Sequence, residues 1–315
     1  MAQVDILLAT YNGERFITSQ LHSLLMQTFS DIRILVHDDG SSDETMKIIR
    51  NFARHDARIV IIDDSRKFGS PTENFLHLLS FATAPWIMFC DQDDIWFDNK
   101  VELMLTEALK VPQGTPAVVY CEALYWHPTR GIVGKGGAYM APRSLPALLG
   151  QKAGVLGCSS MFNRQLKDIM LRYKGKIAMH DHLLELAAFS FGEVRYVSVP
   201  LILYRQHDRN VTGNTDLLLS PTERIKRKIY HSRPVMDAKH LNATSDFLNF
   251  FRDELSDDQI ELLESYLKMS RHNKLRNILT ALRLGLARDN SKLKFILKLI
   301  ISPYLDRENR NNLNH

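Results

Sequence analysis

Residues 86–94 read Trp-Ile-Met-Phe-Cys-Asp-Gln-Asp-Asp, and they show most clearly the pattern from which we predict the fold. The first five residues are apolar enough for a buried strand, and the last four place carboxylates where that strand leaves the core. A carboxylate at the rim of a core needs a partner, because a buried charge without one is costly. We therefore expect Asp91–Asp94 to meet a ligand or a cation rather than to serve the fold alone.

The same order of a short apolar run, polar residues and a segment with helical spacing repeats over the first ~120 residues. Further strands are expected at Val4–Leu8, Arg33–His37 and Ile59–Ile62, besides Trp86–Cys90. The helices between them are expected at Arg15–Met26, Asp43–Arg54, Pro71–Ala82 and Asn99–Leu109. The alternation predicts a doubly wound α/β domain with a parallel sheet, whose ligands lie at the carboxyl ends of the strands.

Three of these strands end in polar residues, at Ala9–Gly13, Asp38–Asp43 and Asp91–Asp94. Because parallel strands share one carboxyl edge, the three polar segments should converge. Clustered carboxylates repel each other unless a hard cation or hydrogen-bond donors separate them, and Mg²⁺ or Mn²⁺ suits such oxygen ligands. For Asp38–Asp43 the alternative is a turn that caps the next helix, and Asp43 in particular has the residue type of a cap.

The middle of the chain, residues 117–207, continues the domain with strands at Ala117–Cys121 and Arg195–Val199 and a helix near His182–Ser190. A Gly-rich stretch, residues 131–137, is expected to be a connection. After Gly213 only helical spacing remains, so we expect a domain at 1–213 and a helical region at 214–315. One stripe of that region is apolar and comprises Leu275, Ile278, Leu279, Leu282 and Leu286.

Charge is divided unevenly between these two parts. The chain has 40 Lys+Arg and 36 Asp+Glu, but from Pro221 onward 18 basic residues face only 12 acidic ones. The front is net acidic and shows no nucleic-acid-binding motif, which argues against a nucleic-acid partner. The three cysteines form no Cys-x-x-Cys pair, which favours a reducing, cytoplasmic setting. We expect neither a secretory signal nor a membrane-spanning helix.

Six segments occur in the order seen in family-2 glycosyltransferases with the GT-A fold, and the sequence most resembles the bacterial branch that builds O-antigen and capsular polysaccharides. They are Thr10-Tyr11-Asn12, Asp38-Asp39-Gly40-Ser41-Ser42-Asp43, Asp91-Gln92-Asp93-Asp94-Ile95-Trp96, Gly157-Cys158-Ser159-Ser160-Met161-Phe162-Asn163-Arg164, His180-Asp181 and Tyr204-Arg205-Gln206-His207. The resemblance covers about residues 1–213. It implies a Rossmann-like, nucleotide-diphospho-sugar-binding domain with a C-terminal helical extension.

The resemblance also implies where a nucleotide-diphosphate sugar and its metal bind. Asp91-Gln92-Asp93 is similar to the family's DXD motif, so Asp93 is expected to hold Mn²⁺ or Mg²⁺. His207 is expected at the metal or diphosphate, and Arg205 at the diphosphate. The nucleotide pocket is expected to comprise Thr10, Tyr11, Asn12, Asp39 and Asp91.

Sugar binding and catalysis are implied in the same way. Asp181 is the expected base, which deprotonates the acceptor hydroxyl in an inverting transfer, and His180 replaces the family's commoner first acid. The alternative for Asp181, a helix cap, is compatible with that role. For the Gly157–Arg164 segment the alternative is a Gly-Ser turn into a helix. The residues expected near donor and acceptor sugars are Asp94, Gly157, Cys158, Asn163, Arg164 and His180.

The function implied is transfer of a hexose, from UDP-glucose, UDP-galactose or dTDP-rhamnose, to a lipid-linked (undecaprenyl-diphosphate) glycan acceptor at the cytoplasmic face of the inner membrane. A nucleotidyltransferase would show a Gly-rich, basic segment after the first strand, where this chain has Thr-Tyr-Asn-Gly-Glu. A non-catalytic sugar-nucleotide-binding or glycan-binding relative is the other alternative. The presence of both Asp93 and Asp181 argues against it.

The segment Lys292–Ile301 bears on membrane association. Lys294 and Lys298 lie on one face of a helix, opposite an apolar face. Such a helix suits a membrane interface with anionic lipids, and it suits a surface helix packed on a core almost as well.

Overall fold

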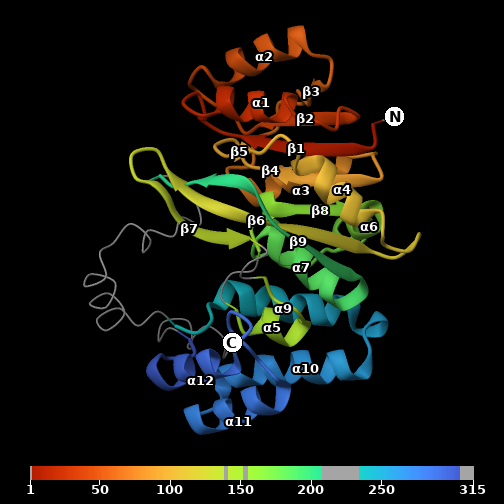
Figure 1. The fold of residues 1–315 in the computed structure, drawn as a ribbon. Helices are drawn as coiled ribbons and strands as arrows, with labels where there is room; N and C mark the ends of the chain where they lie inside the picture. The colour runs from red at the N-terminus through yellow and green to blue at the C-terminus, as the bar shows by residue number, and fades with distance from the viewer. Residues whose placement is uncertain (1, 138–140, 152–154, 208–233, 306–315) are drawn as a thin grey trace. The chain divides into compact units, whose positions relative to one another are not determined.

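We describe residues 2–137, 141–151, 155–207 and 234–305 of a computed structural model (Figure 1). They fall into two compact units. The first comprises residues 2–137, 155–172 and 192–207, and the second comprises residues 141–151, 173–191 and 234–305.

The first unit is built on one nine-stranded mixed sheet in the order β3-β2-β1-β4-β8-β6-β9-β5, with β7 paired to β6. Its first four strands are parallel to one another, as the βα pattern predicts. β8 then pairs antiparallel with both β4 and β6, while β9 runs parallel to β6. The strands are β1 Val4–Thr10, β2 Ile32–Asp38, β3 Ile59–Ile61, β4 Trp86–Cys90, β5 Ile95–Trp96, β6 Ala117–His127, β7 Gly131–Gly137, β8 Ser160–Asn163 and β9 Glu193–Arg205.

Four helices of the first unit lie within a few residues of the expected ranges: α1 Ile17–Leu25, α2 Thr45–His55, α3 Pro71–Phe81 and α4 Lys100–Ala108. The unit also contains η1 Gly157–Ser159 and α6 Arg164–Arg172. Apolar side chains from the strands and from α1 and α4 form one core, and the strand interiors are inaccessible to solvent. A rigid sheet therefore supports the loops that follow β1, β2 and β4.

The Gly-rich stretch is a strand rather than a connection. β7 pairs antiparallel with β6, and Gly136 lies opposite Ala123. A Cβ on Gly136 would lie 2.5 Å from the ring of Tyr125, so only glycine lets the two strands approach this closely beside that ring. The prediction of a loop was wrong because glycine marks both turns and close backbone approaches.

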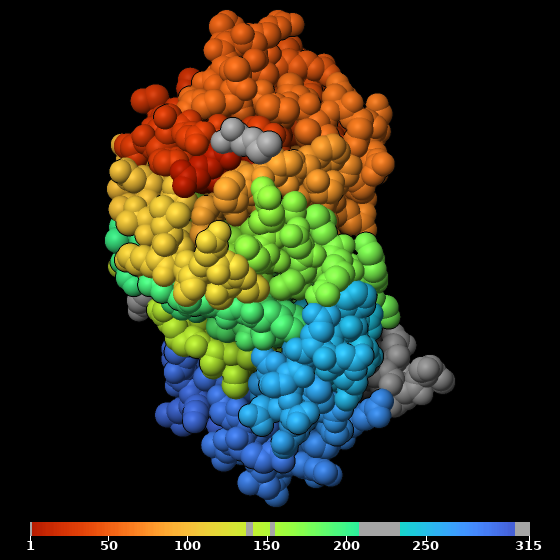
Figure 2. Space-filling model, turned by 90° about the vertical axis from the view of Figure 1, so that its right-hand side faces the viewer, coloured from red at the N-terminus to blue at the C-terminus, as the bar shows by residue number. Residues whose placement is uncertain are grey.

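The second unit contains helices, and its described part after residue 234 forms one contiguous surface, blue in Figure 2. Side-chain caps start several of them, as at Ser256, where a complete capping box begins α10. Gly285, with φ +68°, ends α11 in the left-handed conformation typical of a helix stop. The helices are α5 Leu145–Leu149, α7 His180–Phe191, α9 Ala238–Phe251, η3 Arg252–Glu254, α10 Asp257–Lys268, η4 Met269–Arg271, α11 Lys274–Leu284 and α12 Lys292–Ile301.

The two units differ from the expected division at residue 213 in one respect. Residues 141–151 and 173–191, which were expected to complete the first domain, pack with the later helices instead. Tyr173 shows why, because its ring contacts Phe247, Phe250 and Phe251 of α9. Among the described helices, none is both long and apolar enough to cross a membrane.

Candidate functional site

The carboxyl ends of β1, β2 and β4 lie side by side. Thr10 at the end of β1 pairs with Asp38 at the end of β2, and Leu8 pairs with Cys90 at the end of β4. The predicted convergence of the three polar segments is therefore confirmed. We call this region the carboxyl edge, meaning residues 10–14, 38–43 and 91–94.

Gln92 ties the first and third segments together. Its Oε1 accepts from the Tyr11 backbone N at 2.9 Å, and its Nε2 donates to the Tyr11 carbonyl at 2.9 Å. A Cβ on Gly13 would lie 2.3 Å from Gln92 Oε1, so a larger residue there would displace the Gln92 amide from this position. The Tyr11 side chain is 56% exposed, which leaves its ring open to a flat ligand such as a base.

The loop after β2 is held by its own side chains. Asp38 Oδ2 accepts from the backbone N of Gly40 at 3.1 Å and of Ser41 at 2.7 Å, and Thr10 Oγ1 donates to Asp38 Oδ1 at 2.9 Å. Asp43 accepts from the backbone N of Thr45 at 3.0 Å. For Asp38 and Asp43 the turn-and-cap interpretation therefore describes the contacts.

Asn12 joins that loop from the side of β1. It lies in the left-handed region with φ +47°, where asparagine is among the few tolerated residues. Its Oδ1 accepts from the Ser42 backbone N at 2.9 Å, and its own backbone N donates to Ser41 Oγ at 2.8 Å. The contacts of Thr10 and Asn12 thus shape the edge, whereas Tyr11 presents its ring to solvent.

Asp39 occupies the centre of the edge. Its backbone N donates to the Thr10 carbonyl at 2.9 Å, and its Oδ1 accepts from the backbone N of Phe68 at 2.5 Å. The Lys67 side chain covers Gly40 beside it. Asp39 therefore links the loop after β2 with the segment that precedes α3.

Residues Asp91–Asp94 follow β4, and we call them the acidic run. Within it, Asp93 pairs with His207. Asp93 Oδ2 lies 2.7 Å from His207 Nε2, and the imidazole ring stacks on Phe16 with ring centroids 4.8 Å apart. Arg205 holds the same loop, since its Nε donates to the Asp93 carbonyl at 2.6 Å. Its guanidinium lies against the rings of Phe16 and Trp126.

Asp94 is inaccessible to solvent, and its Oδ1 accepts from the Arg205 backbone N at 3.0 Å. Its Oδ2 is buried without a hydrogen-bond partner of normal geometry, beside the weak thiol donor Cys158. Burial, with the charges of Asp93 and Asp91 added, raises the pKa of Asp94 well above its usual range. A cation at this position would reverse that effect.

The donor atoms present fit a divalent cation. Asp91, Asp94 and Cys158 each offer a ligand atom, all within 4.8 Å of one another. Asp93, which pairs with His207, lies between Asp91 and Asp94 on the loop after β4. The set is rich in carboxylate oxygens, which Mg²⁺ and Mn²⁺ prefer, and the buried Asp94 Oδ2 has only the weak thiol donor of Cys158 beside it.

A buried lysine completes this neighbourhood. Lys100 is inaccessible to solvent, and its Nζ donates to the Cys158 carbonyl at 2.6 Å and lies 3.4 Å from the centre of the Trp96 ring. Gly157 and Cys158 form η1, which contacts β4 and β6. Lysine is seldom fully buried unless paired, so its placement under the carboxyl edge is a functional signal.

Asn163 and Arg164 do not lie at the carboxyl edge, which corrects their expected place. Asn163 pairs with Trp86 at the start of β4, about 16 Å from Asp91 at ~3.3 Å per strand residue. Its side chain accepts from the backbone N of Ala117 and Leu166, and so caps α6. Arg164 bonds the Thr83 carbonyl nearby. The turn-into-helix alternative describes both residues.

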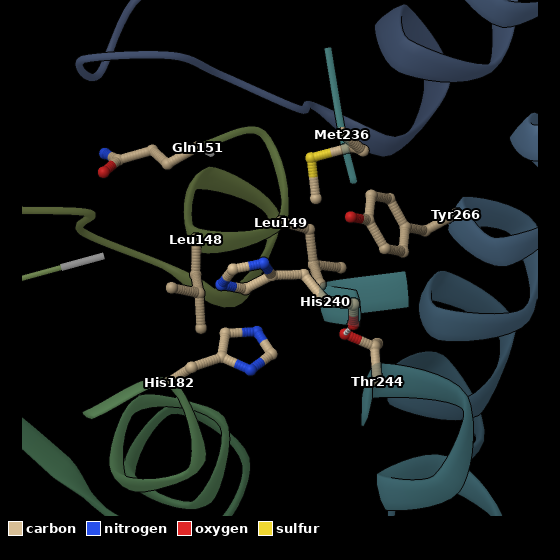
Figure 3. A pocket seen from close by; sticks show the side chains of 8 residues that line it. All are labelled: Leu148, Leu149, Gln151, His182, Met236, His240, Thr244 and Tyr266. Carbon is tan, nitrogen blue, oxygen red and sulfur yellow. Dashed lines mark hydrogen bonds between the residues drawn. The ribbon is translucent and has the colours of Figure 1, made fainter. Parts of the chain in front are cut away.

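His180 and Asp181 begin α7 in the second unit. His180 is buried, and Asp181 is partly exposed and accepts from the backbone N of His182 at 2.8 Å. The role of Asp181 as a base stays a prediction. A small pocket nearby in the same unit leaves room for about one water molecule (Figure 3). It is lined by Leu148, Leu149, Gln151, His182, Met236, His240, Thr244 and Tyr266.

Four residues at or packed against the site were not expected from the sequence: Gln92 of the carboxyl edge, and Lys100, Phe16 and Trp126 next to it. Gln92 lies inside the motif already singled out, so its position was the available signal. The other three pack on the functional side chains from separate elements. Their sequence neighbourhood gives no sign of that packing.

Comparisons with known proteins give the family of the chain. A model of glycosyl transferase family 2 matches residues 5–169, more than half of the 315-residue chain. A dTDP-rhamnosyl transferase, RfbG of Shigella flexneri, is 27% identical over 77% of this chain and 86% of its own length. A UDP-Glc:alpha-D-GlcNAc-diphosphoundecaprenol beta-1,3-glucosyltransferase, WfgD of Escherichia coli, is 35% identical over 34% of this chain and 41% of its own length.

Solved structures show the same fold. TarS 1-349 of S. aureus superposes with a TM-score of 0.54 at 18% identity, covering 94% of this chain and 90% of that one. The mannosyltransferase PcManGT of Pyrobaculum calidifontis, in complex with GDP-Man and Mn²⁺, has a TM-score of 0.55 at 16% identity over 90% of this chain and 73% of its own. The expected GT-A fold is confirmed, and the chain belongs to glycosyltransferase family 2.

Proposed function

We propose that this chain is a metal-dependent, inverting hexosyltransferase that takes its sugar from a nucleotide diphosphate. The observation that supports this most directly is the carboxyl edge, where Asp93 pairs with His207 at 2.7 Å beside the buried, unsatisfied carboxylate of Asp94. The structural relative PcManGT holds GDP-Man and Mn²⁺, and a structure of TarS holds UDP-GlcNAc.

Several residues at the carboxyl edge and beside it receive a role in this proposal. Tyr11 and Asp39 recognise the base, and Asp91 faces the ribose. Asp93 and His207 hold Mn²⁺ or Mg²⁺, which neutralises charge on the diphosphate. Arg205 was expected at the diphosphate, but it is only 7% exposed and already donates to the Asp93 carbonyl, so we assign it the positioning of the acidic loop.

Asp181 is the proposed base. Its carboxylate takes the proton from the acceptor hydroxyl as the oxygen forms a bond to the anomeric carbon. The bond between that carbon and the diphosphate oxygen breaks at the same time, and the nucleotide diphosphate leaves. Attack from the side opposite the leaving group inverts the anomeric centre.

The proposed acceptor is a lipid-linked glycan, and the process is surface polysaccharide synthesis. Both are suggested by the relatives, of which WfgD is named for a diphosphoundecaprenol acceptor. UDP-glucose and UDP-galactose are the favoured donors, and the name of the relative RfbG supports dTDP-rhamnose as a third candidate.

Calorimetric titration of the full chain with these three donors, first with Mn²⁺ and then with EDTA, tests the donor site. We expect one donor to bind with Mn²⁺ and to lose most of its affinity in EDTA. Equal binding in both conditions would contradict a metal-held diphosphate. No binding by a folded sample would favour a relative that has lost the activity.

Asp181→Asn tests the base. We expect donor binding to stay within twofold of wild type and transfer to fall by about two to four orders of magnitude, the usual worth of a positioned base. Asp257→Asn is a matched control, since Asp257 also lies exposed in the first turn of a helix of the second unit. Near-normal transfer by Asp181→Asn would show that another group is the base.

The second unit also presents an apolar and basic surface, which we call the α11–α12 face. α11 and α12 contact each other, and each exposes one stripe of large apolar side chains. The two helices contain six Lys and Arg and no Asp or Glu. The exposed apolar residues are Leu275, Leu279, Leu282, Leu293, Leu297, Ile300 and Ile301.

We propose that the α11–α12 face lies on an anionic lipid surface, which would hold the enzyme at the cytoplasmic face of the inner membrane. Apolar side chains enter the acyl boundary, and each nearby lysine or arginine adds about 1 kcal/mol of attraction to anionic headgroups. Of the two interpretations of Lys292–Ile301, the exposed stripe favours the interfacial helix. Phe295 and Leu299, on the opposite side, pack inward.

Co-sedimentation with vesicles of phosphatidylglycerol and phosphatidylcholine tests this face. We expect binding to the anionic vesicles and at least about a tenfold weaker partition for the double variant Leu293→Gln with Leu297→Gln. Leu109→Gln, at an equally exposed leucine of the first unit, should bind as wild type does. Equal sedimentation of the double variant and wild type would refute the proposal.

A further inference from the structure

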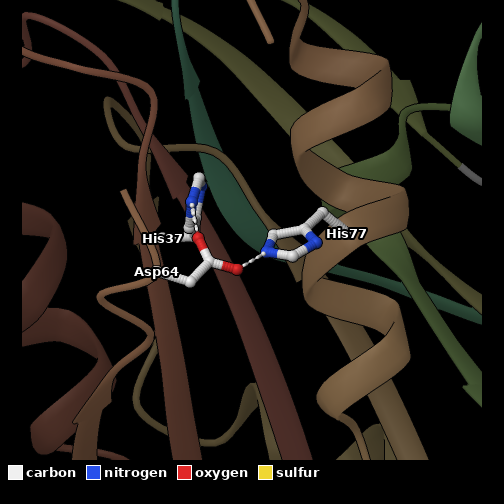
Figure 4. A group of neighbouring side chains, drawn as sticks. All are labelled: His37, Asp64 and His77. Carbon is white, nitrogen blue, oxygen red and sulfur yellow. Dashed lines mark ion pairs between the residues drawn. The ribbon is translucent and has the colours of Figure 1, made fainter. Parts of the chain in front are cut away.

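A second group of metal-ligating side chains lies in the first unit, away from the acidic run. His37 comes from β2, Asp64 from the segment after β3 and His77 from α3 (Figure 4). His37 Nε2 lies 3.4 Å from Asp64 Oδ1, and His77 Nε2 lies 2.7 Å from Asp64 Oδ2. The three ligand atoms all lie within 4.8 Å of one another.

Asn74 sets the tautomer of His37, because it contacts the ring nitrogen on the side away from Asp64. The Asn74 Nδ2 donates to the His37 carbonyl at 3.4 Å, which turns its Oδ1 toward His37 Nδ1 at 2.7 Å. An amide oxygen accepts, so Nδ1 carries a proton and Nε2 is left to face the carboxylate. This arrangement is the one that metal-ligating histidines commonly show, with the second nitrogen donating to a neighbouring acceptor.

His77 supports the same interpretation. Its side chain is more than nine-tenths buried, and its Nε2 lies 2.7 Å from Asp64 Oδ2, within hydrogen-bond distance. A divalent cation would take the place of the proton in this contact, because metal ions bind the deprotonated nitrogen of an imidazole.

The separations and the surroundings suit a transition-metal ion. Two ligands about 2.1 Å from one ion and about 90–110° apart are about 3.0–3.4 Å from each other. The two separations between histidine and carboxylate, 3.4 Å and 2.7 Å, are within a few tenths of an ångström of that range. The two histidine nitrogens, which lie within 4.8 Å of each other, would adjust to the same range when the ion binds. The rings of Phe68 and Phe81 pack on His77, which gives the ion an apolar wall. Two imidazoles and a carboxylate favour Zn²⁺ and similar ions over Mg²⁺.

We propose that His37, Asp64 and His77 bind a zinc-class divalent cation at a site separate from the acidic run. Such an ion would tie together β2, the segment after β3 and α3. Phe68 follows Asp64 by four residues, and its backbone N donates to Asp39. If the proposed nucleotide site is correct, the ion also fixes the backbone beside the base-recognising residue.

Metal-stripped protein, titrated with Co²⁺ in excess Mg²⁺, tests the site without any substrate. We expect one equivalent of Co²⁺ to bind with a visible d–d absorption band, to be displaced by Zn²⁺, and to bind unchanged in Asp93→Asn. His77→Gln and Asp64→Asn should each weaken Co²⁺ by at least about tenfold. His55→Gln, at an exposed histidine of α2, should bind as wild type does.

Thermal unfolding supplies a second readout that does not depend on the band. Zn²⁺ should raise the Tm of wild type and of His55→Gln, and it should leave the Tm of Asp64→Asn unchanged because that variant lacks the carboxylate ligand. Asp64→Asn should still fold, since Asp64 is partly exposed and the amide preserves the shape of the loop. Co²⁺ binding lost in Asp93→Asn but kept in His77→Gln would place the ion at the acidic run instead. No Co²⁺ or Zn²⁺ binding by the folded wild type would overturn the proposal.

UDP affinity with and without Zn²⁺, at fixed Mn²⁺, tests the link to the nucleotide. We expect UDP to bind several-fold more tightly to the Zn²⁺-loaded protein and equally well to both forms of Asp64→Asn. Zn²⁺ binding without any UDP binding would leave the new site standing and contradict the proposed function. Equal UDP affinities in wild type would limit the site to a structural role.

Discussion

The two ends of the central strands use carboxylates in opposite ways. Asp5, at the start of β1, is fully buried and accepts four hydrogen bonds, two from Arg33 and one each from the backbone N of Thr83 and Ala84. Asp94, just beyond the end of β4, is also fully buried, but it accepts one backbone hydrogen bond and leaves its Oδ2 unsatisfied.

This difference separates a carboxylate that serves the fold from one that serves a ligand. A paired, hydrogen-bonded charge has its desolvation offset inside the protein, whereas an unsatisfied one keeps an unfavourable free energy that a bound cation can remove. Residues that lower the stability of the fold in this way, as buried charges without enough hydrogen bonds do, are commonly functional. The same criterion places Asn163 and Arg164 with the fold, because their side chains are hydrogen-bonded at the end where Asp5 lies.

The largest expected effect on stability comes from Asp5→Asn. Loss of the charge breaks a buried ion pair and should lower the free energy of unfolding by about 3 kcal/mol. This value is at the lower end of the range for buried ion pairs, because Arg33 is partly exposed. Urea unfolding measures this, with Asp31→Asn at an exposed position as control. Donor binding by the folded fraction should stay normal. An unchanged unfolding free energy would mean that the pair contributes nothing.

Asp93→Asn should give the opposite result. Removal of one charge from the proposed metal ligands should weaken Mn²⁺-dependent donor binding by at least about tenfold, while urea unfolding stays near wild type. Asp98→Asn, an exposed acid four residues after Asp94, is the matched control for calorimetry. Loss of stability with unchanged binding would move Asp93 into the class of Asp5.

Much of this contrast can be predicted from the sequence. The strands before Asp38 and Asp91 are apolar and regular, and parallel strands must share a carboxyl edge, so convergence follows from periodicity alone. Asn163 was misplaced because a motif gives residue order and not the direction of the strand beneath it, and β8 runs antiparallel. Lys100 was missed because charge predicts exposure, and only the packing of Trp96 and Cys158 buries it.

The helices of the second unit were predicted in type but not in grouping. The helical spacing of residues 180–191 is clear, yet which core they join depends on aromatic contacts from α9 that no local pattern encodes. The position of His37 beside His77 also could not be predicted from a local pattern. They are 40 residues apart and meet only because α3 packs on β2, so the sequence offered two isolated histidines.

A partly buried histidine of the second unit, His182, tests whether a desolvated group gives up its charge. Burial, with His240 nearby, lowers the pKa of His182 to about 3. The unfolded chain therefore binds one more proton than the native state between about pH 6.5 and pH 3, and stability falls as the pH falls, by about 1.4 kcal/mol per unit. Urea unfolding at pH 7, 6 and 5 should show a shallower fall in His182→Leu. Parallel curves would mean that His182 is charged when folded.

The smallest effect, and the sharpest test of the contrast, is expected for Asp94→Asn. The amide oxygen can still accept from the Arg205 backbone N, while the buried charge beside Asp93 and Asp91 is removed. In metal-free protein at neutral pH the variant should therefore be as stable as wild type or more stable by up to ~1 kcal/mol, whereas Asp5→Asn is strongly destabilised.

With Mn²⁺ and donor present, wild type should be more stable than Asp94→Asn, because ligand-linked stabilisation is reduced in the variant. Thermal unfolding in both conditions measures the two differences on one sample. Destabilisation of the metal-free variant would show that Asp94, like Asp5, is held by the fold, and the acidic run would then have to bind its cation through Asp91, Asp93 and His207.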